Sequence, residues 1–321
     1  MRDRKRTLMS IGFTVVFAAM LWGCGTQATP SNPADTPTSH QGESSRTGTS
    51  QTKIYMSENG PVRVPAHPKR VVCLATLDGD FIALGVHLVG VDSYAKQDPL
   101  FAKQLEHVEV VTDSDLDKIM KLKPDLIVGL SNTNNVERLK AIAPVVLYKY
   151  DNHYDALKQF IEIGKLVGKE AEAKAWVAEF ERQVQQAVDQ IRKKIGAQST
   201  VSVLGVDGKE MWAFGSNWGR GGEILYGLMH LKAPQAIEQT AMKQGYQQIS
   251  EEAMPQFFGD YVFLNKWPGA DMSFQQSPVY QNLPAVTQHH VYVVDESIFA
   301  FNDPLSLQYE LKVIRKDLLG N

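Results

Sequence analysis

One stretch of the sequence places side chains that can bind a ligand among glycines. Residues 215–223 read GSNWGRGGE, so Trp218 and Arg220 alternate with glycine. Glycine lets the backbone approach a ligand closely, while the indole and the guanidinium project from it. An arginine fork can donate to two anionic oxygens at once, and a tryptophan offers an apolar wall. The spacing fits neither a dinucleotide fingerprint nor a P-loop. The stretch predicts a ligand site, and the alternative is a structural turn in which Arg220 pairs with a nearby acid.

The segments before and after residues 169–195 predict two α/β lobes. Strands that alternate with helices are typical of a parallel sheet covered on both faces, and a hairpin opens the second half. Ligands of such sheets bind beyond the carboxyl ends of the strands, so Tyr94, Tyr150 and the loop after Leu130 are candidates for a cleft wall. The expected strands are 70–75, 88–91, 126–128, 145–148, 200–206, 211–214, 261–264 and 291–294, and the expected helices are 77–84, 116–122, 136–142, 224–229, 251–258, 279–283 and 305–319.

A long amphipathic helix is predicted between the lobes. Residues 169–195 contain no glycine or proline, and apolar residues recur at spacings of three and four. A helix of this length spans roughly 40 Å, which suits a connection across two bodies. We therefore expect an α/β fold of two Rossmann-like lobes with mainly parallel sheets, joined by one long α-helix, with the ligand cleft between them. The expected boundaries are 53–153 for the first lobe, 154–196 for the helical connector and 197–321 for the second lobe.

The N-terminal residues predict export and a lipid anchor. A basic start and an apolar run from Leu8 to Trp22 form a signal peptide over residues 1–23. The residues before Cys24 resemble a bacterial lipobox, which implies a lipid on Cys24; a plain secretory signal is the alternative. Residues 24–52 are mostly small and polar, as in a flexible tether. The body is therefore expected outside the cytoplasmic membrane. Cys73, the other cysteine, reads as a small buried hydrophobe.

Composition narrows the function further. The chain has 321 residues, a formal net charge of −3 and 43% hydrophobic residues. This charge balance gives no reason to expect nucleic-acid binding. No nucleophile elbow or zinc-protease motif is present, so an extracytoplasmic enzyme is a remote alternative. His289 and His290 are adjacent before an expected strand and would point to opposite faces, which argues against direct metal capture.

Two segments of the chain resemble each other. Residues 115–128 and 250–263 each contain a cap, a short helix, an aspartate and a strand, and Asp117 and Glu252 each stand eight residues before their aspartate. This repeat indicates a pseudo-symmetric molecule. An acid on the first turn of a helix opposes the helix dipole, which is the simplest explanation of both residues.

The sequence resembles bacterial substrate-binding lipoproteins of ABC importers, in the class III group with a helical interlobe connector. Within that group it is similar to the ferric hydroxamate siderophore receptors of Gram-positive bacteria. The resemblance covers roughly residues 53–320 and is carried by KPDLIV at 123–128, NWGRGGEILY at 217–226, GDYV at 259–262 and NDP at 302–304. It implies a monomeric binding protein, lipid-anchored to the cell membrane, that captures a ferric siderophore and delivers it to the permease subunits of an ABC transporter.

The resemblance also implies roles for particular residues. The tryptophan and arginine of NWGRGGEILY contact the iron–hydroxamate centre in the family, and one carboxylate on each lobe, here Asp117 and Glu252, meets an arginine of the permease. Leu130 and Ala300 stand where the family has aromatic residues, which puts the particular siderophore in doubt. The candidate ligand-binding residues are Trp218, Arg220, Trp212, Tyr150, Phe299, Phe301 and Trp267.

The ligand itself remains open among several metal complexes. A hydroxamate siderophore fills all six positions on Fe(III), so the protein need supply no metal ligand and no resident cofactor is expected. A tris-catecholate complex carries about three negative charges and would favour several basic residues, and Lys149 and Lys266 are available to join Arg220. Citrate siderophores, haem and cobalamin are further candidate ligands, of which haem would want an axial Met, His or Tyr.

Overall fold

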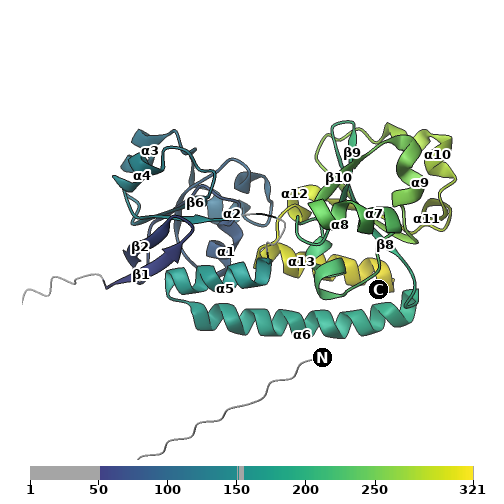
Figure 1. Cartoon of the computed structure of the whole chain (residues 1–321), viewed down its shortest axis with the longest axis horizontal. Helices are drawn as coiled ribbons and strands as arrows, with labels where there is room; N and C mark the ends of the chain where they lie inside the picture. The colour runs from purple at the N-terminus through teal and green to yellow at the C-terminus, as the bar shows by residue number, and fades with distance from the viewer. Residues whose placement is uncertain (1–50, 150, 152–154, 321) are drawn as a thin grey trace, which may run out of the picture. The chain divides into compact units, whose positions relative to one another are not determined.

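The computed structural model describes residues 51–149, 151 and 155–320 (Figure 1). The predicted signal peptide, Cys24, nearly all of the tether and Tyr150 lie outside the described residues. Within the described residues, no helix combines the length and the apolar character that crossing a membrane requires. The two predicted sheets both lie in the compact unit Thr49–Asn321.

The first lobe is built on a parallel five-stranded sheet in the order β5-β4-β3-β6-β7. Successive residues of its central strands enter different cores: Val72 and Ile127 pack with α3 and α4, whereas Cys73 and Val128 pack with α1 and α5. Burial of both faces explains the continuous apolar runs of these strands. The elements are β3 (Val71–Cys73), α1 (Asp78–Ala83), β4 (Leu88–Val91), η1 (Ala95–Gln97), α2 (Ala102–Leu105), β5 (Glu109–Val110), α3 (Leu116–Lys121), β6 (Leu126–Leu130), α4 (Val136–Lys140), β7 (Val145–Tyr148) and α5 (Ala156–Val167).

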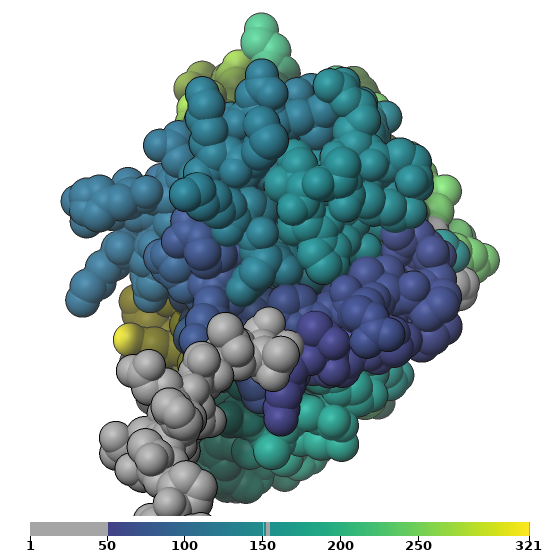
Figure 2. All heavy atoms as spheres, turned by 90° about the vertical axis from the view of Figure 1, so that its left-hand side faces the viewer, coloured from purple at the N-terminus to yellow at the C-terminus, as the bar shows by residue number. Residues whose placement is uncertain are grey.

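A hairpin that the sequence did not predict precedes this sheet. Strands β1 (Thr52–Ser57) and β2 (Gly60–Pro65) pair antiparallel, with Ser57 opposite Gly60 at the turn. Glu58 N–H donates to the Leu147 carbonyl, which ties the hairpin to β7. Figure 2 looks onto the first lobe, where the darkest purple spheres belong to this hairpin.

The second lobe contains a mixed five-stranded sheet in the order β10-β9-β8-β11-β12. Strands β8, β11 and β12 pair in parallel, whereas β9 pairs antiparallel with both β8 and β10. The predicted hairpin is therefore confirmed, and two of the four strand pairings in this sheet are antiparallel. The elements are β8 (Val201–Asp207), β9 (Glu210–Phe214), the π-helix η2 (Glu223–Leu228), α7 (Gln235–Gln239), α8 (Ala241–Gln244), β10 (Tyr246–Ile249), η3 (Glu251–Ala253), α9 (Met254–Phe257), β11 (Tyr261–Lys266), η4 (Ser273–Gln276), α10 (Pro278–Gln281), α11 (Pro284–Thr287), β12 (Val291–Asp295), α12 (Glu296–Phe299) and α13 (Pro304–Leu319).

The predicted connector, residues 154–196, contains α5 and the long helix α6 (Glu170–Ile195). Helix α6 has 26 residues and begins after Gly168, the C-cap of α5. Gly168 adopts φ 77°, a left-handed conformation that favours glycine and lets the chain reverse. The apolar stripe of α6 is buried, from Ala173 to Ile195, against α5 and α13. Figure 1 shows α6 running beneath both sheets, which confirms two α/β lobes joined by one long helix.

The internal repeat is visible in the two sheets. Asp125, just before β6, accepts hydrogen bonds from the backbone of Lys69 and Arg70, which lead into β3. Asp260, just before β11, accepts the equivalent bond from the backbone of Thr200, which leads into β8. In both lobes the repeated aspartate therefore fixes the start of the neighbouring parallel strand. This supports the pseudo-symmetry that the sequence indicated.

The lobes meet where the start of α13 packs on the first lobe. Asp303 caps α13, and a β-carbon at Gly79 of α1 would lie 2.1 Å from the Asp303 Cγ. Ser306 Oγ lies 3.3 Å from Asp98 Oδ2 of the first lobe. Glycine at position 79 therefore allows α13 to approach α1 closely and to hold the lobes together beneath the cleft.

Candidate ligand-binding site

A cavity of about 520 Å³ opens at the carboxyl ends of the strands. Tyr94 follows β4 of the first lobe, whereas Asp207, Trp267 and Glu296 lie at or just after the ends of β8, β11 and β12. This is the position at which sheets of this type bind ligands. The lining residues are Tyr94, Gln97, Gly205, Asp207, Glu210, Trp212, Phe214, Trp218, Arg220, Tyr246, Trp267 and Glu296.

The glycine-rich loop needs its glycines for conformation and for close packing. Gly219, Arg220 and Gly221 have consecutive positive φ values of 71°, 63° and 87°. A β-carbon at Gly219 would lie 2.5 Å from the Ala300 carbonyl oxygen, and one at Gly222 would lie 2.2 Å from the Gly215 carbonyl oxygen. Positive φ is uncommon for a residue with a side chain, and such strain concentrates at binding sites. The loop thus holds Arg220 in one orientation at the cavity.

Arg220 is fixed by three groups before any ligand arrives. Its Nε and Nη2 both lie 2.8 Å from Glu296 Oε1, and its Nη1 donates to the Trp218 carbonyl at 2.7 Å. The guanidinium carbon lies 4.2 Å from the centre of the Phe214 ring. A guanidinium has five N–H donors, and the Tyr94 hydroxyl also shares a hydrogen bond with Arg220, so these bonds leave one N–H for a ligand. The guanidinium therefore still has a donor for a ligand, and the alternative pairing with an acid is also present, with Glu296.

Burial keeps these polar groups from water. The side chains of Arg220 and Glu296 are 19% and 4% exposed. Burial raises the pKa of Glu296, and the charge of Arg220 opposes this effect. The second oxygen of Glu296, Oε2, is buried and has no hydrogen-bond partner among the described residues. A charge-assisted pair in such surroundings is stronger than one in water.

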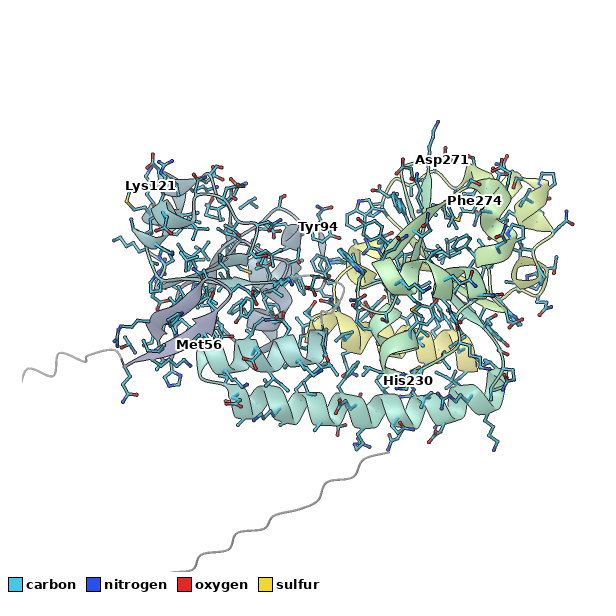
Figure 3. All side chains as sticks on the ribbon, in the orientation of Figure 1. Met56, Tyr94, Lys121, His230, Asp271 and Phe274 are labelled. Carbon is cyan, nitrogen blue, oxygen red and sulfur yellow. The ribbon has the colours of Figure 1, made fainter. Side chains whose placement is uncertain are left out.

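Tyr94 brings the first lobe to the cavity. Its ring stacks on Trp267 of the second lobe, with centroids 5.7 Å apart and planes within 3°, and also packs on Phe301. Burial raises the pKa of the Tyr94 hydroxyl, while the nearby Arg220 opposes the rise through its charge and a hydrogen bond. Figure 3 shows Tyr94 between the two lobes, on the side facing the second. The stack therefore joins both lobes at the wall of the cavity.

The opposite wall is aromatic. Tyr246 makes edge contacts with Trp218 and Trp212, at centroid distances of 5.2 and 5.7 Å. Gly245, with φ 97°, lies directly against the Trp218 indole, where a β-carbon would be 2.0 Å from Nε1. This wall offers a broad apolar surface of the kind that suits the hydrocarbon arms of a ligand.

The structure brings together four of the seven predicted ligand-binding residues: Trp212, Trp218, Arg220 and Trp267 all line the cavity. Tyr150 lies outside the described residues. Leu130 and Ala300, the positions that depart from the family, do not line the cavity.

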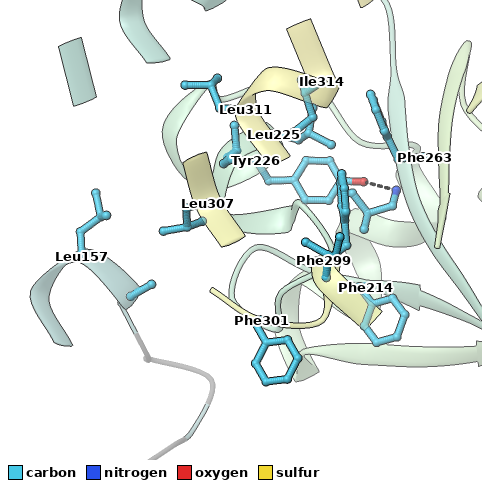
Figure 4. Packing of buried hydrophobic residues seen from close by; sticks show 14 of the residues in the cluster. Leu157, Phe214, Leu225, Tyr226, Phe263, Phe299, Phe301, Leu307, Leu311 and Ile314 are labelled. Carbon is cyan, nitrogen blue, oxygen red and sulfur yellow. Dashed lines mark hydrogen bonds between the residues drawn. The ribbon is translucent and has the colours of Figure 1, made fainter. Parts of the chain in front are cut away.

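The structure does not place Phe299 and Phe301 on the cavity wall. They are 1% and 4% exposed and belong to the buried core that Figure 4 shows. The Phe299 ring makes an edge contact with Tyr309 of α13. The Phe299 backbone carbonyl accepts a hydrogen bond from the backbone N–H of Arg220. Phe301 packs behind Tyr94. A position near the cleft does not fix which way a side chain points, and both residues pack behind the cavity wall.

Sequence reasoning missed several lining residues. Glu296 directly follows the strand 291–295, so the strand-end rule that indicated Tyr94 would also have indicated Glu296. Tyr246 follows a glycine and opens a short strand that was not predicted. Asp207 ends β8 and Glu210 begins β9, on either side of the turn of the predicted hairpin.

The acids predicted to dock a permease lie away from the cavity. Asp117 is exposed on the first turn of α3, and Glu252 is exposed in η3. In Figure 1, α3 and α9, which follows η3, both lie far from α6. Among the described residues, no group of three His, Cys, Asp or Glu side chains is arranged to hold a metal ion.

Comparison with known proteins connects this geometry to a family. The sequence pattern of the family described as periplasmic binding protein matches residues 71–298. The iron(3+)-hydroxamate-binding protein FhuD of Bacillus subtilis (strain 168) is 34% identical over 313 residues, which cover 95% of this chain and 96% of that protein.

Solved structures show the same similarity. The FhuD protein from S. pseudintermedius has a TM-score of 0.77 and 33% identity, covering 84% of this chain and 99% of that chain. FhuD2 from Staphylococcus aureus with bound ferrioxamine B has a TM-score of 0.74 and 31% identity, covering 79% of this chain and 99% of that chain.

Proposed function

This chain belongs to the periplasmic binding protein family, and we propose that it captures a ferric hydroxamate siderophore in the cavity between its lobes. The relatives are named as binding proteins for iron(3+)-hydroxamate, and FhuD2 holds ferrioxamine B. They are not named as enzymes. The function is therefore binding and transfer, with no reaction at the site.

The observation that carries the proposal is the state of Arg220. Its remaining N–H group belongs to a guanidinium that is already oriented by Glu296, the Trp218 carbonyl and the Tyr94 hydroxyl. Hydroxamate oxygens bound to Fe(III) carry partial negative charge and accept such bonds, while the iron needs no ligand from the protein. The aromatic walls then contact the apolar arms of the complex.

The basic residues that a catecholate complex would favour do not reach the cavity. Lys149 pairs with Asp151 at 2.7 Å, and neither Lys149 nor Lys266 lines the cavity. A complex with about three negative charges would find one arginine there, already paired with a carboxylate. This supports a hydroxamate over a catecholate or citrate complex.

Tryptophan fluorescence tests the proposal, because three of the five tryptophans line the cavity. Titration with ferric hydroxamate, ferric catecholate, ferric citrate, haem and cobalamin should give quenching below about 1 µM only with the hydroxamate complex. Saturable quenching by another member of the panel, with none by hydroxamates, would assign the cavity to that ligand.

We further propose that the protein is a monomer held outside the cytoplasmic membrane by a lipid on Cys24, and that it delivers its ligand to ABC permease subunits. The resemblance to siderophore receptors supports this, and some relatives are named lipoproteins. Cys24 lies outside the described residues.

Docking through Asp117 and Glu252 is a separate prediction. Both acids are exposed and neither lines the cavity, so replacing both with alanine should leave siderophore affinity unchanged. Iron uptake by cells that depend on this protein should be lost, because each carboxylate is proposed to pair with an arginine of the permease. Normal uptake by the double variant would show that the two acids have no docking role and only oppose a helix dipole.

A further inference from the structure

More negatively charged than positively charged side chains line the cavity. Among the described residues that line the cavity, Arg220 is the one cationic side chain, and three are carboxylates: Glu296, Asp207 and Glu210. Glu296 pairs with Arg220, so these two charges largely cancel. Asp207 and Glu210 therefore leave the cavity with an excess of negative charge. Two nearby lysines, Lys209 and Lys266, do not line it.

The two remaining carboxylates are exposed and unpaired. Neither forms a salt bridge with any residue that the structure describes. Their Cα atoms are direct partners across the β8–β9 hairpin. Like charges directly opposite each other on neighbouring strands are destabilising. The hairpin thus carries a repulsive pair at the edge of the cavity, and folding gains nothing from it.

The negative charge extends inward from this pair. The negative charge of Asp207 contributes to the raised pKa of Glu296, so the two carboxylates repel each other electrostatically. Glu296 is 3% exposed, and its Oε2 is buried without a hydrogen-bond partner in the described part of the chain. A buried acceptor without a partner is costly, and a positively charged group in the cavity would lower that cost.

We propose that Asp207 and Glu210 select ferric hydroxamate complexes that carry a positively charged group, such as a protonated amine on the siderophore chain. This rests on the proposed function and specifies the ligand class within it. Three hydroxamates neutralise Fe(III), so the centre facing Arg220 has no net charge, while an ammonium on one arm lies near the carboxylates. Anionic ferric complexes are repelled by the same pair.

A matched pair of probes tests this selection. Ferrioxamine B has a free amine that is protonated at neutral pH, and its N-acetyl derivative has the same ferric centre without the charge. The wild-type protein should bind ferrioxamine B about three- to tenfold more tightly than the acetylated complex at low salt. This ratio should fall towards one in about 0.5 M salt, since both carboxylates are exposed.

The variant Asp207→Asn/Glu210→Gln should lower the ratio of the two dissociation constants to near one. It should also be at least as stable as the wild type in urea, because it removes a repulsive pair. The control Glu181→Gln/Asp189→Asn makes the same charge change on exposed positions of α6 and should keep the wild-type ratio.

The outcomes separate the inference from the proposed function. Equal affinity of the wild type for both complexes at low salt, or an unchanged ratio in Asp207→Asn/Glu210→Gln, would overturn the inference while leaving hydroxamate binding intact. Failure of both complexes to bind the wild type would contradict the proposed function itself, and the inference with it.

Discussion

At the level of single residues, Arg220 is held by partners of different kinds. Glu296, the Trp218 carbonyl and the Tyr94 hydroxyl hold most of the guanidinium, and the remaining N–H is left for a ligand. Pre-orientation of this kind reduces the side-chain entropy that binding would otherwise cost. The pair therefore positions a donor and does not occupy it fully.

The planar shape of Arg220 should matter as much as its charge. A lysine ammonium cannot bond Glu296, the Trp218 carbonyl and a ligand oxygen in one plane. Arg220→Lys should therefore weaken hydroxamate binding roughly tenfold, and Arg220→Ala or Trp218→Ala by about ten- to hundredfold, in calorimetric titrations. All three variants should unfold cooperatively. Wild-type affinity in Arg220→Ala and Trp218→Ala would remove these residues from the site.

Single residues also show what sequence reasoning can and cannot give. Trp218 and Arg220 were found because glycines surround them, a local signal that survives without a structure. Glu296 was missed because its importance lies in a contact with Arg220, 76 positions away. The direction of Phe299 depends on how α12 packs on α13, which the local sequence does not show. Local chemistry is readable from the sequence, whereas side-chain direction needs the packed elements.

At the level of elements, the loop before β10 shows how glycine shapes the aromatic wall. Gly245→Ala would place a β-carbon on the Trp218 indole at a φ of 97° that alanine resists. We expect lower hydroxamate affinity and lower stability. Gly60→Ala is the matched control, because Gly60 has φ 91° but no atom within 4 Å of a β-carbon. It should lose a similar amount of stability from strain alone and keep normal affinity.

The result that would contradict this role of Gly245 is equal loss of affinity in Gly245→Ala and Gly60→Ala. Backbone strain in the left-handed region costs about 1–2 kcal/mol whatever lies nearby. Only the collision at Gly245 reaches Trp218, so only that variant should change the cavity.

The elements that could be predicted are those with strong apolar patterns. The central strands of both sheets and helix α6 were predicted because burial gives them continuous or periodic apolar residues. Strand β10 reads Tyr-Gln-Gln-Ile and lies at a sheet edge, where burial does not dictate the side chains. Hairpin β1–β2 contains Pro61 and Pro65 and follows a polar tether, so its pattern is weak.

At the level of the whole molecule, the interface between the lobes is acidic. Asp98 of the first lobe and Asp303 of the second are both buried and approach the same Ser306 hydroxyl. Burial, reinforced by the charge of Asp303, raises the pKa of Asp98 to about 7. An aspartate in an unfolded chain titrates near about 3.9.

This difference predicts a pH-dependent stability. Between about pH 4 and pH 7 the folded state keeps a proton on Asp98 that the unfolded chain releases, so stability falls as pH rises through this range. Asp98→Asn has no such proton. In urea denaturation, the free energy of unfolding of Asp98→Asn should rise relative to that of the wild type, by on the order of 1–3 kcal/mol, as pH increases across that range. A constant difference at all pH values would contradict the raised pKa; Asp189→Asn on exposed α6 is the control.

The connector predicts little motion on binding. Helix α6 is continuous over 26 residues, and the Tyr94–Trp267 stack already joins the lobes across the cavity. A single helix provides no pair of flexible strands to act as a hinge. Solution scattering curves with and without ferric hydroxamate should nearly superimpose. A clear fall in radius of gyration would show that α6 bends or that the lobes rotate.

The most direct measurement is a crystal structure of the protein with a ferric hydroxamate complex. We expect the iron centre in the cavity, with a hydroxamate oxygen accepting a hydrogen bond from the guanidinium of Arg220 and the arms of the ligand against Trp218 and Trp212. A ligand seated elsewhere, such as the hollow lined by Lys158 and Leu228, with Arg220 still untouched, would contradict the proposed binding site.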